Sequence, residues 1–247
     1  MGSFSQAVSA WGLLDGVLLI DKPAGPTSHD VVRKIRRRFA IRKVGHGGTL
    51  DPNATGLLVI LLGKGTKLSD RFLGSDKAYS GIARLGRVTD TQDCDGKVLE
   101  ENPWRGVTRE QLETAVAENF CGDIFQTPPM VSAIKSNGVP LYKLARKGVE
   151  VERKARLVHV YRFVVTEWAP PLVSFEIDCT KGTYVRTLVH DLGRFLGCGA
   201  CLDALRRTGS GPFNVKDAAG LEEVLSWSEE QLAARIIPFS RALNLSR

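Results

Sequence analysis

The sequence predicts an α+β domain in which a mixed sheet is flanked by helices. Apolar patterns typical of strands and of helices are interspersed, without the regular βαβ alternation that builds a parallel sheet. Neither an internal repeat nor a low-complexity segment interrupts them. The 247 residues, 43% hydrophobic and 25% charged, suffice for one large domain or two small ones with an ample core.

The first part of the chain is expected to begin with a strand and a helix. Residues 16–20 form an apolar run that predicts a strand. In residues 31–39 the apolar side chains recur at helical spacing, and Ser28 or Asp30 can cap this helix. Residues 56–62 and 80–85 predict two further strands, the first of them buried.

Later elements follow from the same signals. Thr108 and Gln111 have the spacing of a capping box, which predicts a helix through Phe120. Another amphipathic helix contains Val185 and Leu192, and Ser228 begins a second capping box within the final helix. The predicted ranges are strands at 158–167, 172–179 and 202–207, and a closing helix near 221–236.

Charge favours a polyanionic partner. The net charge is +7 and the isoelectric point is near 9.3. One face of the helix predicted at 31–39 is strongly basic, and this pattern fits either a solvated face or contact with RNA. The residues on that face are Arg33, Lys34, Arg36, Arg37 and Arg38.

No apolar run approaches the roughly 18 residues of a membrane span. Residues 1–14 are interpreted as a loose leader that lacks the basic start of a signal peptide, so we expect a cytoplasmic protein.

Five cysteines, an odd number, favour reduced thiols. Cys198 and Cys201 have C-x-x-C spacing, yet no second such pair or paired histidines accompany them, which favours structural thiols over a metal or redox site.

Residues 45–58 carry the strongest candidate for chemistry. Their sequence is GHGGTLDPNATGLL, and it places Asp51 in a loop rich in glycine directly before an apolar run. Glycine lets a backbone approach a ligand closely, and Pro52 keeps Asp51 out of the helical region. From these residues alone, an ordinary Asp-Pro turn and a reactive carboxylate are both open.

This loop resembles the catalytic loop of the TruB family of tRNA pseudouridine synthases, in its bacterial form. Its family pattern runs roughly G-H-x-G-x-L-D-P-x-A-x-G, and here Gly47 stands where Thr is usual. The resemblance continues in family order from about residue 16 to residue 207. Its further motifs are GVLLIDKPAG at 16–25, DKAY at 76–79, ARLG at 83–86, TDT at 89–91, PPMVSAIK at 128–135, LYKLARKG at 141–148, KGTYVRT at 181–187 and LRR at 205–207.

The resemblance implies an activity: isomerisation of uridine to pseudouridine in the T-loop of tRNA, conventionally at position 55. Asp51 would be the catalytic nucleophile, and Arg186 its charge partner, although a surface cation at a helix start is the alternative. The target base must be flipped out of the folded arm. The other implied substrate-binding residues are His46 in the vacated space, Tyr79 and Tyr184 against the base, Leu205 lining the pocket, and Lys22 and Lys135 at phosphate or in support of the pocket.

The implied organisation is one catalytic domain at 15–247, with the pseudouridine synthase fold. Residues 121–155 resemble its RNA-binding insertion, and their glycines, prolines and cations suggest a mobile flap over phosphates. The small C-terminal RNA-binding (PUA) domain of many bacterial relatives is not expected here. The reaction is redox-neutral, and neither a Walker loop nor a complete dinucleotide fingerprint is present, so we expect no cofactor and no metal. The expected partner is the T-arm of tRNA, bound by a monomer without an obligatory protein partner.

Overall fold

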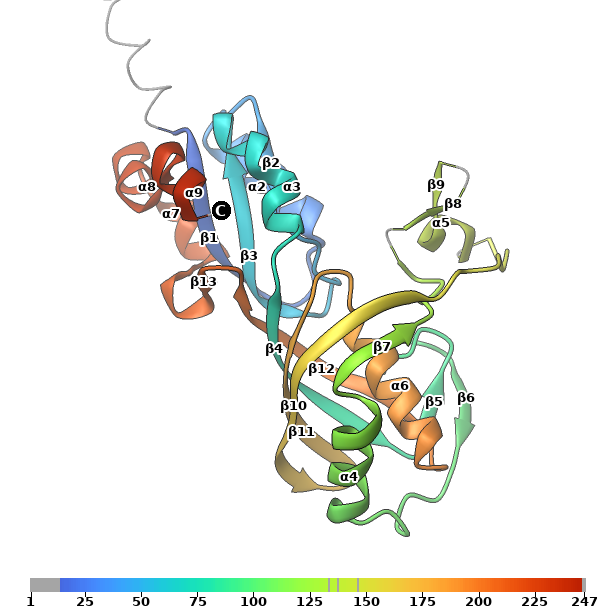
Figure 1. Cartoon of the computed structure of the whole chain (residues 1–247). Coiled ribbons are helices and arrows are strands. Elements are labelled where there is room, and N and C mark those ends of the chain that lie inside the picture. Colours follow the sequence, from blue (N-terminus) through green and yellow to red (C-terminus); the bar gives the residue numbers. More distant parts are fainter. Residues whose placement is uncertain (1–13, 133, 137, 146, 246–247) are drawn as a thin grey trace, which may run out of the picture. The chain divides into compact units, whose positions relative to one another are not determined.

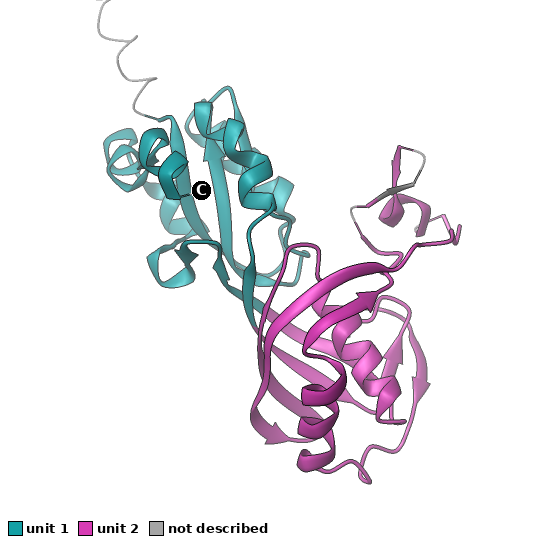
Figure 2. Ribbon diagram, in the orientation of Figure 1, with its two compact units in different colours: residues 1–79, 206–247 teal, residues 80–205 magenta. Residues whose placement is uncertain are grey.

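The computed structural model describes residues 14–132, 134–136, 138–145 and 147–245, so nearly all of the predicted leader lies outside the described residues. The described chain forms two compact units (Figure 2). Unit 1 combines the residues up to 79 with those from 206 onward, and unit 2 comprises residues 80–205. Every helix in the part of the chain that the structure describes is too short or too polar to span a bilayer.

Unit 1 is built around strand β3 (Thr55–Leu62). Strand β1 (Gly16–Lys22) pairs with it antiparallel, from Gly16 opposite Leu62 to Lys22 opposite Gly56. Strand β2 (Val44–His46) is antiparallel to β3, whereas β12 (Ala200–Ser210) pairs with its start in parallel. Parallel and antiparallel pairs in one sheet confirm the predicted mixed sheet. Short strands β13 (Phe213–Asn214), β14 (Ala219–Gly220) and β15 (Ile237–Pro238) pair with β12 or β1.

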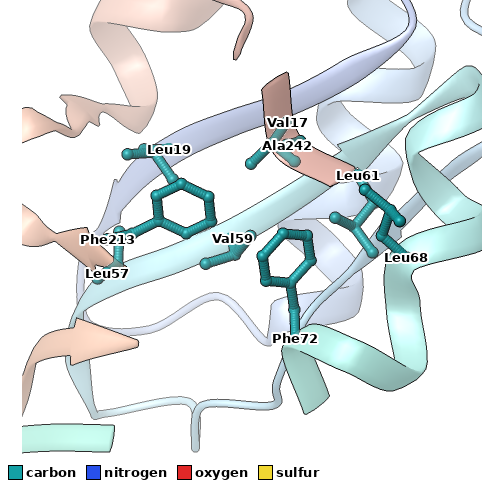
Figure 3. Close-up of a cluster of buried hydrophobic side chains, with 9 residues drawn as sticks. All are labelled: Val17, Leu19, Leu57, Val59, Leu61, Leu68, Phe72, Phe213 and Ala242. Carbon is teal, nitrogen blue, oxygen red and sulfur yellow. The ribbon is translucent and has the colours of Figure 1, made fainter. Parts of the chain in front are cut away.

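Because β3 is central, both of its faces are buried. Alternate side chains, Leu57, Val59 and Leu61, lie on one face with Val17 and Leu19 from β1 (Figure 3). Phe72 and Phe213 pack against this face with their ring centroids 5.3 Å apart, and Leu68 and Ala242 complete the cluster. A continuous run of apolar residues is what a strand buried on both faces requires.

Helix α2 (Ser28–Arg38) begins differently from the prediction. Its N-cap is Thr27, whose side chain accepts from the Asp30 backbone N–H, while the Asp30 carboxylate accepts from Thr27. Neither Ser28 nor Asp30 is the cap, so that prediction was wrong. Asp30 instead closes a capping box from the third helical position. The side chain of Ser28 is turned inward and buried, with consequences for the site described below.

The remaining helices of unit 1 are short. A 3₁₀ helix, η1 (Gly63–Leu68), leads into α3 (Ser69–Leu73), and a second 3₁₀ turn, η2 (Val215–Asp217), follows β13. The single closing helix predicted at 221–236 is wrong. Two helices, α7 (Leu221–Ser226) and α8 (Glu229–Arg235), occupy this range, because Trp227 is extended and Ser228 caps α8. Helix α9 (Phe239–Leu245) follows β15.

Unit 2 contains a sheet in the order β12-β4-β11-β10-β7. Its strands are β4 (Lys77–Leu85), β7 (Gly122–Gln126), β10 (Arg156–Ala169) and β11 (Leu172–Cys179), together with β12. Helices α4 (Arg109–Asn119) and α6 (Val185–Phe195) are both present as expected, and Thr108 and Gln111 form the predicted capping box. A hairpin of β5 (Arg87–Thr89) and β6 (Val98–Glu101) was not predicted.

The range 121–155, predicted as an insertion, is only partly separate from the sheet. Strand β7 pairs along β10, with Gln126 opposite Arg156 and Gly122 opposite Val160. Beyond it, strands β8 (Lys135–Ser136) and β9 (Val139–Pro140) form a hairpin of their own, followed by helix α5 (Leu141–Ala145), and these three elements group together in Figure 1. The sheet of unit 2 therefore extends into the start of this range.

Candidate active site

The loop that carries Asp51 joins β2 to β3. Asp51 is half-exposed, and its carbonyl oxygen accepts from the backbone N–H of Ala54 at 3.2 Å, which closes a turn. Gly56, the second residue of β3 after this turn, has a φ of +96°, and a Cβ atom added there would lie 2.3 Å from the carbonyl oxygen of Arg207. Only glycine tolerates this conformation and approach, so β3 lies directly against β12 where it leaves the loop.

Lys22, at the end of β1, holds the loop by its main chain. Its side chain is fully buried, and its Nζ donates to the carbonyl oxygens of Pro23, Pro52 and Ala54 at 2.8, 2.7 and 2.8 Å. Burial lowers the pKa of Lys22 to about 8, although attraction to the Asp51 carboxylate opposes this shift. Of the two roles predicted for Lys22, phosphate contact is therefore wrong in this structure, since RNA cannot reach a fully buried ammonium. The residue supports the loop.

Arg207, in β12, holds the main chain of the same loop and of the start of β3. Its guanidinium is 1% exposed and donates to the carbonyl oxygens of Gly48, Thr49 and Leu57, at 3.1, 3.2 and 2.7 Å. Burial lowers the pKa of Arg207, and a hydrogen bond and charge interaction with Tyr79 oppose the shift. Tyr79 is half-buried in β4. Arg207 was given no role of its own from the sequence, although it lies in the LRR motif at 205–207 and is a charge within a predicted strand.

Ser28 provides a third tether, also missed from the sequence. Its Oγ accepts from the backbone N–H of Leu50 at 2.8 Å and donates to the Leu50 carbonyl oxygen at 3.1 Å. Leu50 directly precedes Asp51. Buried side chains from β1, α2 and β12 thus fix the main chain on both sides of the carboxylate, in the way that a reactive group must be held for chemistry.

His46 lies at the end of β2, beside a second histidine. Its Nε2 is 3.3 Å from Nδ1 of His29, and the two rings meet edge to face with centroids 5.3 Å apart. Burial lowers the pKa of His46 to about 4, and positive charge on His29 and Arg207 lowers it further. The ring is therefore uncharged at neutral pH, and its Nδ1 accepts weakly from the backbone N–H of Gly48 at 3.4 Å.

Unit 2 carries the other predicted site residues. Tyr184 precedes α6, where its backbone N–H donates to the Gln126 side chain at 2.7 Å and its carbonyl accepts from the same amide at 3.0 Å. Leu205 is half-buried in β12, and Lys135 lies in β8. Gln126 thereby joins β7 to the start of α6.

Arg186, in the first turn of α6, is only 4% exposed. Its guanidinium donates to the carbonyl oxygens of Thr91 and Val131, at 2.9 and 2.8 Å, and lies 3.7 Å from the Asp93 carboxylate. The alternative of a surface cation is therefore wrong. A buried guanidinium at the positive end of a helix is costly, and such groups concentrate at functional sites.

The two units thus each hold one half of the predicted set. Unit 1 contains Lys22, His46, Asp51 and Tyr79, and unit 2 contains Lys135, Tyr184, Arg186 and Leu205. In unit 1 the charge of Arg207 acts on Lys22, His46 and Tyr79, and Asp51 interacts with Lys22. Unit 1 therefore contains the Asp51 carboxylate, and unit 2 contains the buried guanidinium of Arg186.

Residues 36–185 match the model of the "TruB family pseudouridylate synthase (N terminal domain)", and residues 186–244 match that of the "tRNA pseudouridylate synthase B C-terminal domain". The chain belongs to the TruB family. The first match contains Asp51, Tyr79 and Tyr184, and the second begins at Arg186.

Curated relatives extend over most of this TruB-family chain. It is 51% identical to tRNA pseudouridine synthase B of Opitutus terrae, over 93% of this chain and 95% of the relative. It is 46% identical to the protein of the same name from Syntrophotalea carbinolica, over 93% of this chain and 75% of the relative.

Two solved structures have the same fold. One is a Cbf5-Nop10-Gar1 complex, whose matching chain is 31% identical with a TM-score of 0.74; the match covers 95% of this chain and 63% of that one. The other is an H/ACA RNP bound to a substrate RNA containing 2'-deoxyuridine, 28% identical with a TM-score of 0.71 over 96% and 63% of the two chains. The pseudouridine synthase fold predicted from the resemblance is confirmed.

Proposed function

We propose that this chain isomerises uridine to pseudouridine in the T-loop of tRNA, at position 55, with Asp51 as the nucleophile. Family membership and relatives named tRNA pseudouridine synthase B, 51% and 46% identical, support the reaction and the substrate. The observation that carries the assignment to Asp51 is its loop, which Lys22, Ser28 and Arg207 hold by its main chain. Such tethering presents one carboxylate in a fixed position.

The reaction requires an ionised nucleophile and conserves all atoms of the base. The N1–C1′ bond breaks, the base turns, and a new bond joins C5 to C1′; C5 loses a proton, and N1 gains one. An opposite charge close to Asp51 would favour its ionised form. We assign this charge to Arg186, whose guanidinium is buried and already oriented by Thr91 and Val131.

The target base must leave the stack of the T-arm before Asp51 can reach it. We assign His46 to the space that the base vacates, since its uncharged ring can lie against neighbouring bases. Tyr79 and Tyr184 would stack on the flipped base, and stacking on an aromatic ring contributes about 1–3 kcal/mol per base. Leu205 would line the pocket.

Several exposed cations could neutralise phosphates of the tRNA. Lys143, Lys147, Lys154 and Arg156 are exposed within or next to the range 121–155, which we propose as the RNA-binding insertion of a single catalytic domain. The exposed basic face of α2 fits the same role, and solvation alone also explains it. We propose that the chain acts alone on tRNA, as a monomer in the cytoplasm.

Incubation of the purified chain with an unmodified tRNA transcript tests the function. We expect pseudouridine at position 55 without guide RNA or added protein, and none with the Asp51→Asn variant, checked for deamidation. The variant should bind tRNA within several-fold of the wild-type affinity, because the amide keeps the shape of the carboxylate. A transcript with cytidine at position 55 is the matched substrate control.

Two results would contradict the proposal. Product that forms only with a guide RNA and partner proteins would assign the chain to the class of the H/ACA complexes. Tight binding of tRNA without product would indicate a folding factor.

A further inference from the structure

Two cysteine thiols meet in unit 2, although 107 residues separate them in the sequence. Cys94 lies in the turn after β5, and Cys201 lies near the start of β12. Their Sγ atoms are 3.1 Å apart. The main chain fixes this approach, since the Cys94 N–H donates to the Leu202 carbonyl at 2.9 Å and the Leu202 N–H donates to the Gln92 carbonyl at 3.0 Å.

The C-x-x-C spacing of the sequence does not describe this pair. Cys198 donates from its thiol to the Gly199 carbonyl oxygen at 3.3 Å, whereas the sulfur of Cys201 lies against Cys94. Separations of about 3–3.5 Å between reacting atoms are those of a near-attack arrangement. Since neither thiol is in a disulfide, the pair is in its reduced form.

The two thiols differ in exposure and in acidity. Cys94 is half-exposed, and Cys201 is fully buried. The hydrogen bond from Cys201 lowers the pKa of Cys94, and one from Arg84 acts in the same direction, while burial and Asp203 oppose them. The pKa of Cys201 is raised by the same hydrogen bond and by burial. Cys94 is therefore the thiol that ionises first and that an oxidant can reach.

We propose that Cys94 and Cys201 form a reversible disulfide site, with a peroxide as the oxidant. The Cys94 thiolate attacks one peroxide oxygen, which forms the sulfenic acid and releases hydroxide or alkoxide. The Cys201 thiol then attacks the Cys94 sulfur, the S–S bond forms, and water leaves. Two thiols and one hydrogen peroxide thus give one disulfide and two waters, and an external dithiol reverses the step.

The disulfide would fasten the segment that holds Arg186. Between β5 and Cys94, Thr91 accepts from Arg186 at 2.9 Å, and the Asp93 carboxylate lies 3.7 Å from the same guanidinium. The side chain of Gln92 accepts from Thr187 at 2.7 Å. A covalent link from Cys94 to β12 therefore ties this segment to the sheet at the point where it supports Arg186.

Mass spectrometry of the full chain tests the proposal. The reduced protein is treated with hydrogen peroxide, its free thiols are alkylated, and the tryptic peptides are compared with those of a sample reduced again by dithiothreitol. We expect Cys94 and Cys201 to lose alkylation together and to appear in one cross-linked peptide pair that dithiothreitol releases. The half-exposed Cys121 is the internal control, and Cys121→Ser should give the same cross-link.

Two variants separate the steps. In Cys201→Ser, oxidation should stop at the Cys94 sulfenic acid, which dimedone traps. In Cys94→Ser, the buried Cys201 should stay alkylatable after unfolding. The proposal is overturned if Cys94 and Cys201 oxidise no faster than Cys121, or if Cys94 cross-links two copies of the chain instead. None of these readouts uses isomerase activity, so failure here leaves the proposed function standing.

Discussion

The Nζ atom of Lys22 donates a hydrogen bond of 2.7 Å to the carbonyl oxygen of Pro52, the residue that directly follows Asp51. The two residues are 30 positions apart, and the register of β1 against β3 brings them together. A buried ammonium costs stability unless its donors are all used, and here they bind three carbonyl oxygens. This arrangement makes Lys22 a structural support for the Asp51 loop.

Lys22→Met should lower the free energy of unfolding by about 2–4 kcal/mol, because three inward-facing carbonyls lose their donor. Urea unfolding of the two proteins measures the difference. Lys64→Met is the control. The side chain of Lys64 is exposed and forms an ion pair with Asp15 at 3.3 Å, and loss of this pair should cost less than about 1 kcal/mol. If the two substitutions lowered the free energy of unfolding equally, Lys22 would not be the structural support of the Asp51 loop.

Arg207→Lys should reduce kcat about 10- to 100-fold and leave KM for tRNA within several-fold. A lysine ammonium lacks the planar fork that now binds Gly48, Thr49 and Leu57, so Asp51 would be less precisely positioned. Steady-state kinetics check this, with Arg162→Lys, an exposed partner of Glu176, as the matched control. A raised KM with unchanged kcat would indicate that Arg207 binds RNA instead.

Gly47→Ala should destabilise the protein by about 1–3 kcal/mol, the usual cost of overpacking. A Cβ atom at Gly47 would lie 2.7 Å from the Cβ of Phe72, so any side chain at this position forces its neighbours to shift. Gly45→Ala is the matched control, since its nearest neighbour, on Thr66, would be 3.8 Å away. In thermal unfolding, we expect a lower midpoint temperature than the wild type for Gly47→Ala and an unchanged one for Gly45→Ala.

His46 should make stability fall with acid in a defined window. Its pKa in the folded protein is about 4, below the ordinary value of 6.5, so between these values the unfolded chain binds a proton that the folded chain does not. The contribution of the neutral His46 side chain to the free energy of unfolding is complete above pH 6.5 and is lost as the pH falls towards 4. In His46→Asn this loss is absent, so the wild type should lose more stability than the variant between pH 7 and 4. Chemical denaturation at several pH values gives the free energy of unfolding of both proteins. An equal fall of this free energy in wild type and variant between pH 7 and 4 would refute the shift.

Local patterns were sufficient for most elements. The alternation in 172–179 predicted β11 with its observed bounds, and the Thr108 capping box predicted the start of α4. Local signals failed where two of them competed. Trp227 continued the apolar pattern of a helix, but Ser228 is a strong cap and begins a new one, so one predicted helix became two.

The sequence by itself determined the α+β class, the turn that presents Asp51 and the family, because strand and helix periods and turn residues act over a few positions. Only the tertiary structure decided what holds that turn. Ser28, Lys22 and Arg207 reach it across 22, 30 and 158 residues. Cys94 and Cys201 meet in the same way, across 107 residues. Such contacts depend on strand register and on buried main-chain carbonyls, which every residue carries alike, so no side-chain pattern in the sequence marks them.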